Sequence, residues 1–260
     1  MRTIGERLMS NNDEKVTREF PVLSSVQHVV ENARRVFLHA GPLLAAARQW
    51  GPMLEASPAW QHPCHYFDDT AQTVRWIFVL DVLNHCFWAD PGAPTWSVSY
   101  RRHTYSGYWG LAASLKRAVE NGVPITRSNY LARLRCEDLQ QVFAGNGQIP
   151  MLPERLENLR EAGRVLLSEW QGDIVHLLEA AGGSAVKTIA LVTAAFPSFR
   201  DQALYRGETV TFWKRAQIFA ADLYLAFAGR GWGSFRDIGR LTAFADYKLP
   251  QVLRELGALS

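Results

Sequence analysis

The sequence predicts a mainly α protein with one small β-hairpin, and three observations support this prediction. Apolar residues recur at helical spacing through most of the 260 residues. Prolines, glycines and polar capping residues separate these apolar segments. Hydrophobic residues make up 48% of the chain and charged residues 20%, which is typical of a globular protein with a large core. We therefore expect a loose polar segment at 1–20 and one helical catalytic domain over 21–260, built as one unit or as two packed lobes.

The expected elements follow from local signals, taken in chain order. Ser25 is a candidate cap for the first helix, and Asp69 or Thr70 for a helix that is apolar nearly all round and should be buried. Alternation with period two at 96–100 predicts a short strand. Glycines and prolines end most of the segments. The expected helices cover 25–37, 43–50, 74–87, 108–119, 138–143, 153–162, 165–178, 186–195, 210–228, 235–244 and 250–256.

Composition and motifs exclude several classes of protein. The three cysteines are odd in number and lack zinc-ligand spacing, so we expect a reducing compartment and no metal. No signal peptide and no apolar run of about 20 residues is present, and we expect a cytoplasmic protein without a membrane partner. The net charge is only +3 and the basic residues are dispersed, which argues against a stable nucleic-acid complex. Phosphate-loop, dinucleotide-binding, nucleophile-elbow and zinc-protease motifs are missing, and we expect no cofactor.

Aromatic and polar side chains gather at three expected junctions between loops and helices. The segments are 65–69, 83–88 and 105–109, and they combine Phe, Trp and Tyr with Asp and Asn. Flat bases bind proteins by stacking on aromatic rings and by hydrogen bonds at their edges. These segments predict a pocket for a planar ring, although each ring on its own is better explained as part of the core.

Two charged residues are candidates for chemistry. Lys214 lies on the long helix expected at 210–228, on one face with Gln217 and Ile218. If that face points inward, its ammonium needs a carboxylate or an anionic ligand, and Asp222 two turns later is one internal candidate. The plainer alternative is a surface lysine. Asp246 precedes a helix that begins near a proline, so it is either a helix cap or a carboxylate that stabilises an oxocarbenium-like transition state.

Seven segments, in order from His65 to Gln251, resemble the queuosine salvage family of 5′-phosphate N-glycosylases/hydrolases. Each is modest alone, and the set covers about two-thirds of the chain. The segments are HYFDD (65–69), FVLDVLNHCFW (78–88), YSGYWGLAASLKRAVENGVPIT (105–126), IPMLPERLENLREAG (149–163), FPSFRD (196–201), FWKRAQI (212–218) and FADYKLPQ (244–251). Members of the family continue well beyond the last segment, whereas this sequence ends at Ser260.

The resemblance implies hydrolysis of the bond between queuine and ribose in queuosine 5′-monophosphate, and also in queuosine, releasing queuine for salvage into transfer RNA. It implies an all-α fold similar to helix-hairpin-helix DNA glycosylases, in which Lys214 and Asp246 are the catalytic pair. Edge hydrogen bonds are assigned to Asn84, Asp68 and Asp69, and ring contacts to Phe87, Trp88, Tyr108 and Trp109. Arg215 and Lys248 are candidates for the phosphate.

Two other functions are alternatives to this interpretation. The first is a nucleic-acid base glycosylase, which the implied fold favours and the modest charge disfavours. The second is a queuine-binding protein without catalysis, which the presence of both Lys214 and Asp246 disfavours.

Overall fold

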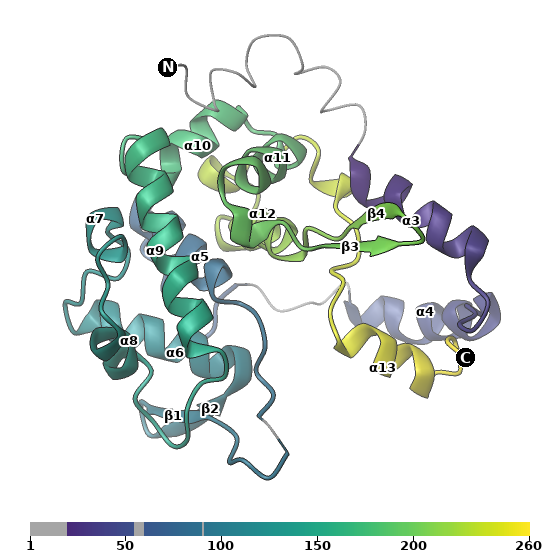
Figure 1. Cartoon of the computed structure of the whole chain (residues 1–260), viewed down its shortest axis with the longest axis horizontal. Helices are drawn as coiled ribbons and strands as arrows, with labels where there is room; N and C mark the ends of the chain where they lie inside the picture. The colour runs from purple at the N-terminus through teal and green to yellow at the C-terminus, as the bar shows by residue number, and fades with distance from the viewer. Residues whose placement is uncertain (1–19, 55–59, 90) are drawn as a thin grey trace.

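The computed structural model describes residues 20–54, 60–89 and 91–260, and it is mainly α as predicted (Figure 1). The loose segment expected at 1–20 lies outside the described residues except for Phe20. Short 3₁₀ turns occur at 197–199, 231–233 and 238–240. The helices are α3 (Pro21–Asn32), α4 (Ala40–Leu54), α5 (Ala71–Val82), α6 (Gly107–Glu120), α7 (Ser128–Leu131), α8 (Cys136–Val142), α9 (Leu152–Glu169), α10 (Ile174–Ala181), α11 (Ala185–Ala195), α12 (Lys214–Ala226) and α13 (Lys248–Glu255).

Helix α5 forms the centre of the hydrophobic core. Thr70 caps it, because its side-chain oxygen accepts the Gln72 N–H at 3.0 Å. The helix is apolar on all sides and packs against α6, α9, α10 and α12, which surround it. Phe78 is buried at its middle among three aromatic rings, those of Phe196, Phe199 and Phe219.

The prediction that this helix continues to Phe87 was wrong, because α5 ends at Val82. Two arginines from other helices, buried Arg155 and partly buried Arg215, donate to the carbonyl oxygens at and beyond this point. Arg215 on α12 donates to the carbonyl of Val82 at 2.5 Å, and Arg155 on α9 donates to the carbonyls of Leu83, His85 and Cys86. These guanidinium groups replace the helical N–H donors that would otherwise follow. The residues after α5 therefore form an irregular segment, whose backbone Arg155 fixes in place.

The chain contains two hairpins among the described residues, where the sequence predicted one. Strand β1 (Ser97–Tyr100) pairs with β2 (His103–Ser106), which places a strand where alternation predicted it. Strand β3 (Gln202–Tyr205) pairs with β4 (Glu208–Thr211), so the helix expected from 210 begins only at Lys214. The missed signal is the turn at Arg206 and Gly207, whose φ angles are 51° and 85°.

Three further helix boundaries differ from the prediction. Helix α3 begins at Pro21, and Ser25 inside it accepts the Thr211 N–H at 3.0 Å instead of capping. The two helices expected at 153–162 and 165–178 are α9 and α10, which divide where Gln171 and Gly172 adopt positive φ angles of 53° and 82°. The helix expected at 235–244 is only a 3₁₀ turn in an otherwise irregular segment.

The C-terminal residues pair with the segment that connects α3 and α4. Phe37 and His39, between α3 and α4, exchange backbone hydrogen bonds with the last residues, 258–260. This pairing holds α13 beside the connection to α4, at the lower right of Figure 1. The segment that leads into α13 thus faces the end of α5, and a cavity lies between them. No described helix is long and apolar enough to cross a membrane.

Candidate functional site

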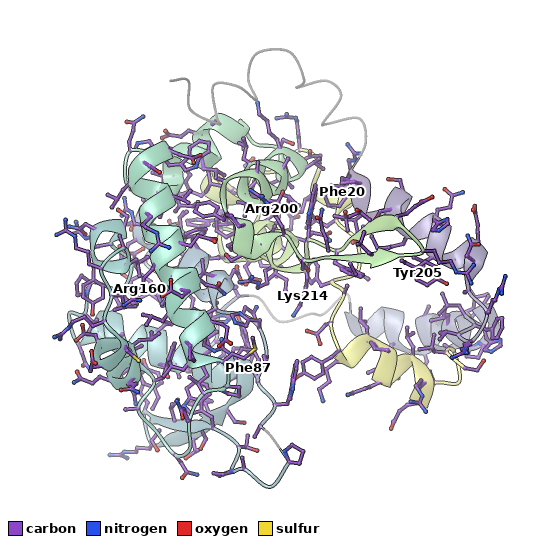
Figure 2. The ribbon with its side chains drawn as sticks, viewed as in Figure 1. Phe20, Phe87, Arg160, Arg200, Tyr205 and Lys214 are labelled. Carbon is purple, nitrogen blue, oxygen red and sulfur yellow. The ribbon has the colours of Figure 1, made fainter. Side chains whose placement is uncertain are left out.

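A cavity of about 1140 Å³ opens where the irregular segment after α5 faces the start of α12 and the segment before α13. Its wall comprises residues 84–88, Gly107 and Tyr108 at the start of α6, part of α9, the first turns of α12, and residues 243–249. In Figure 2, Phe87 and Lys214 lie near this space, on the segment after α5 and on α12 respectively. The volume is large enough for a nucleotide, since ligand pockets usually range from about 300 to 1,000 Å³.

Lys214 and Asp246 form an ion pair in the cavity wall. Lys214 Nζ donates to Asp246 Oδ2 at 2.6 Å, and the two side chains are 18% and 28% exposed. The other carboxylate oxygen, Asp246 Oδ1, accepts the backbone N–H of Lys248 at 2.9 Å. Burial opposes ionisation of Asp246, but the hydrogen bonds from Lys214 and Lys248 outweigh it and hold the pKa of the carboxyl below its ordinary value. Asp246 is therefore a carboxylate at neutral pH, and Asp222 is not the partner of Lys214.

Asp201 is a cavity residue that the sequence analysis did not select. Its Oδ2 accepts the backbone N–H of Lys214 at 2.9 Å and so anchors the first turn of α12. Its Oδ1 is buried and has no hydrogen-bond partner among the described residues. Burial raises the pKa of Asp201, although the Lys214 N–H and the nearby Arg215 and Lys214 charges act in the opposite direction. The signal was present in the FPSFRD segment, which ends on this residue.

Aromatic rings form another part of the wall. Phe87 lies against the guanidinium of Arg155, which is 5.3 Å from the ring centroid. Trp88 meets Tyr247 edge to face with 4.8 Å between centroids, and both rings are partly exposed. Tyr108 lines the cavity from the start of α6. A flat base can enter between such faces and edges.

Histidine and asparagine follow α5 on the same wall. His85 is partly buried, and burial together with the charges of Arg155, Arg215 and Lys214 lowers its pKa to about 3. The imidazole is therefore neutral, and its Nδ1 is buried without a hydrogen-bond partner among the described residues. Asn84 is nearly buried and makes one long contact, from Nδ2 to Asp81 Oδ1 at 3.4 Å. Both side chains retain hydrogen-bonding capacity for a ligand.

Three residues expected to bind substrate lie outside the cavity wall. Asp68 accepts hydrogen bonds from Thr70, Thr73 and the Tyr66 hydroxyl, so it builds the start of α5. Asp69 is exposed, with a φ angle of 60° in the turn before the helix. Trp109 stacks on His62 with centroids 3.7 Å apart and is not among the residues that line the cavity. The site that we propose below therefore omits these three residues.

The two candidates for the phosphate differ in availability. Arg215 lines the cavity, but its guanidinium donates to the carbonyls of Val82 and Ser198 and lies 4.9 Å from the centroid of Phe199. Its hydrogen-bond donors are thus used inside the protein. Lys248 is exposed at the cavity wall, with Nζ 5.5 Å from the centroid of Tyr247. Of the two, only Lys248 is free to meet an anionic group.

Two carboxyl groups, Asp81 on α5 and Asp222 on α12, lie behind the cavity wall and influence each other. Asp81 is fully buried, and its pKa is raised by burial and then by the charge of Asp222. Burial raises the pKa of Asp222 to about 7. The Oδ2 atom of each is buried without a hydrogen-bond partner in the described part of the chain. The pair therefore retains a proton at a pH where an exposed aspartate would have lost it.

Metal ligands do not gather in the part of the chain that the structure describes. No group of three or more His, Cys, Asp or Glu side chains there is placed to hold a metal ion.

Comparison with known proteins decides the family. The sequence model of the family described as "Queuosine salvage protein" matches residues 64–260. The chain belongs to the queuosine salvage family. The matched range contains the ion pair, Asp201 and the aromatic wall of the cavity.

Several relatives in this family carry the name queuosine 5′-phosphate N-glycosylase/hydrolase. The protein from Sphaerobacter thermophilus is 48% identical over 238 residues, which are 92% of this chain and 73% of that protein. The protein from Nematostella vectensis is 40% identical over 76% of this chain and 58% of its own length. The protein from Bos taurus is 36% identical over 90% of this chain and 71% of its own length. The chain thus spans roughly three-fifths to three-quarters of these relatives.

Proposed function

We propose that this chain hydrolyses the N-glycosidic bond of queuosine 5′-phosphate and releases queuine. One observation carries the proposal: the Lys214–Asp246 ion pair lies in the wall of a nucleotide-sized cavity that aromatic rings also line. The names of the relatives support the choice of substrate, since several act on this nucleotide according to those names.

Asp246 supplies the charge that the reaction needs. Cleavage of a glycosidic bond passes through an oxocarbenium-like state, in which positive charge develops on the sugar. A fixed carboxylate beside the anomeric carbon stabilises that charge or accepts a proton from the attacking water. Lys214 keeps Asp246 ionised through its hydrogen bond at 2.6 Å. The bond between the anomeric carbon and the base nitrogen breaks. Water supplies a hydroxide to the carbon, and its remaining proton goes to the departing nitrogen.

The leaving base requires stabilisation at its edges. Queuine is a 7-deazaguanine and lacks the ring N7 that could otherwise be protonated. We assign edge hydrogen bonds to Asp201 Oδ1, which has no partner among the described residues, and to Asn84, which makes one long contact to Asp81. We also assign to Asp201 the pairing with the secondary ammonium of the queuine side chain, because a buried carboxylate oxygen without a partner favours a cationic group.

Ring and phosphate contacts complete the assignment. Phe87, Trp88 and Tyr108 hold the base, and Tyr247 extends this surface beside Trp88. Lys248 meets the 5′-phosphate, since Arg215 is committed to backbone carbonyls. We also propose that the released queuine enters transfer-RNA modification. We further propose that the protein is cytoplasmic, because its described cysteines are unpaired and the cytoplasm keeps thiols reduced.

The decisive test is a chromatographic assay of the purified protein. The substrates are queuosine 5′-monophosphate, queuosine and guanosine monophosphate, each with and without chelator. Release of queuine from the first, unchanged by chelator, is the expected result. A folded protein that binds queuine but releases none would contradict hydrolysis and favour a binding function. Salt-sensitive binding to RNA, with base release from the polymer alone, would favour a nucleic-acid glycosylase instead.

A further inference from the structure

The hydroxyl group of Tyr108, a residue of the cavity wall, is hydrogen-bonded to a buried histidine. Tyr108 lines the cavity, and its Oη lies 2.8 Å from Nε2 of His65. His65 is 8% exposed and comes from the loop before α5. Its ring stacks on Trp60 with centroids 3.8 Å apart and meets Tyr108 edge to face at 5.8 Å. The histidine itself does not line the cavity.

The second ring nitrogen of His65 defines its tautomer. Nδ1 lies 2.7 Å from the carbonyl oxygen of Trp60. A carbonyl oxygen can only accept, so Nδ1 carries a hydrogen and donates it. In a neutral imidazole the other nitrogen, Nε2, is then an acceptor.

The surroundings of His65 keep the imidazole neutral. The ring is enclosed by Trp60 and Trp76, and the Lys116 ammonium donates to the backbone carbonyl of His65 itself at 2.8 Å. Burial lowers the pKa of His65 to about 4. The hydrogen bond to Trp60 acts against this shift, and the charges of His62 and Lys116 add to it. At neutral pH, Nε2 of His65 therefore accepts, and the Tyr108 hydroxyl donates to it.

Tyr108 has only one hydroxyl hydrogen, and this hydrogen bond uses it. Burial and then the charges of Asp222 and Asp81 hold the pKa of Tyr108 above its ordinary value, so the hydroxyl remains protonated. The Tyr108 oxygen can therefore act toward a ligand only as a hydrogen-bond acceptor, through its lone pairs. Without His65, the same hydroxyl could rotate and serve a ligand either as donor or as acceptor.

We propose that His65 is a positioning residue that directs the Tyr108 hydroxyl hydrogen away from the cavity, so that Tyr108 Oη selects a ligand with an N–H donor. The proposal rests on the proposed function, because the ligand is taken to be queuine. Queuine carries N–H donors on its ring and its side chain, and an analogue with an acceptor at the same position would leave two acceptors facing each other.

The test compares His65→Phe, His65→Gln, Tyr108→Phe and the double variant His65→Phe/Tyr108→Phe. Phenylalanine retains the ring that stacks on Trp60, and glutamine restores an acceptor near the position of Nε2. Queuine binding is measured by calorimetry, and kcat and KM are measured with queuosine 5′-monophosphate. Circular dichroism and thermal melting establish that each variant is folded.

We expect His65→Phe and Tyr108→Phe each to weaken queuine binding by roughly 3- to 10-fold, the size of one hydrogen bond. KM should rise by a similar factor with little change in kcat, because the contact is made equally in ground and transition states. The double variant should bind no more weakly than Tyr108→Phe alone. His65→Gln should bind within about twofold of the wild type, since its acceptor replaces Nε2.

Two results would overturn the inference. One is a His65→Phe variant that binds queuine as tightly as the wild type. The other is a double variant whose loss of queuine affinity equals the sum, as free energies, of the losses in His65→Phe and Tyr108→Phe. If His65→Phe does not fold, His65→Gln and the double variant His65→Gln/Tyr108→Phe decide. A loss of queuine binding in His65→Gln that persists in the Tyr108→Phe background would show that His65 does not act through Tyr108. Since binding of queuine is read without turnover, a wild type that binds but does not hydrolyse would refute only the proposed function.

Discussion

Replacement of Asp246 by asparagine is the sharpest test of the chemistry at this site. The substitution removes the charge and retains the shape, and the amide oxygen can still accept the Lys248 N–H that Asp246 Oδ1 accepts at 2.9 Å. A carboxylate about 4 Å from a developing positive charge contributes about 4 kcal/mol at an effective dielectric constant of about 20. The attraction to Lys214 offsets part of this, so we expect kcat to fall about 10²- to 10³-fold with a small change in KM.

The assay is release of queuine from queuosine 5′-monophosphate under single-turnover conditions. Asp138→Asn is the matched control, because this aspartate is paired with Arg135 at 2.8 Å on α8 and lies outside the cavity wall. Its activity should equal that of the wild type. If a folded Asp246→Asn protein retained kcat within about threefold of the wild type, the role given to Asp246 would be refuted.

Three further predictions follow from the charges around the cavity. Lys214→Met removes the hydrogen bond that lowers the pKa of Asp246, while burial continues to raise this pKa. The acid limb of the pH profile of kcat should therefore move to higher pH, and an acid limb at the wild-type position would contradict this. Asp201→Asn should raise KM about tenfold or more, whereas exposed Asp69→Asn should leave KM within about twofold, and steady-state kinetics with the nucleotide compares them. The folded-state pKa of Asp222 is raised from 3.8 to about 7, so the folded protein holds a proton that the unfolded chain has lost, and stability from this group falls as the pH rises from about 4 to about 7. Asp222→Asn should reduce this fall in a series of thermal melts at pH 5 to 8, and an identical pH dependence in both proteins would refute the assignment.

The helical class and several element boundaries followed from local signals. A segment that is apolar nearly all round predicted the buried helix α5, and its cap at Thr70 was one of the two residues named for it. The strand β1 was predicted from alternation over a few residues. The second hairpin was missed because the apolar residues before α12 also fit a helical pattern, and the turn at Arg206 and Gly207 was not given enough weight.

Family membership could also be recognised from the sequence alone, because the matching segments occur in a fixed order along the chain. Those segments include Lys214 and Asp246, which the structure places 2.6 Å apart although they are separated by 32 positions. The segments did not distinguish residues that line a cavity from residues that build the scaffold. Asp68 and Asp201 both belong to such segments, and only Asp201 lines the cavity.

Local sequence determined the helices, their caps and the residue types available for chemistry, because these depend on neighbours within a few positions. Tertiary structure decided where α5 ends, since Arg155 and Arg215 reach its last carbonyls from distant helices. It also decided the roles of side chains: Arg215 donates to backbone carbonyls, while Asp201 lines the cavity and has one buried oxygen without a partner among the described residues. Such assignments depend on which atoms meet across long separations in the chain, and no pattern within a short segment contains that information.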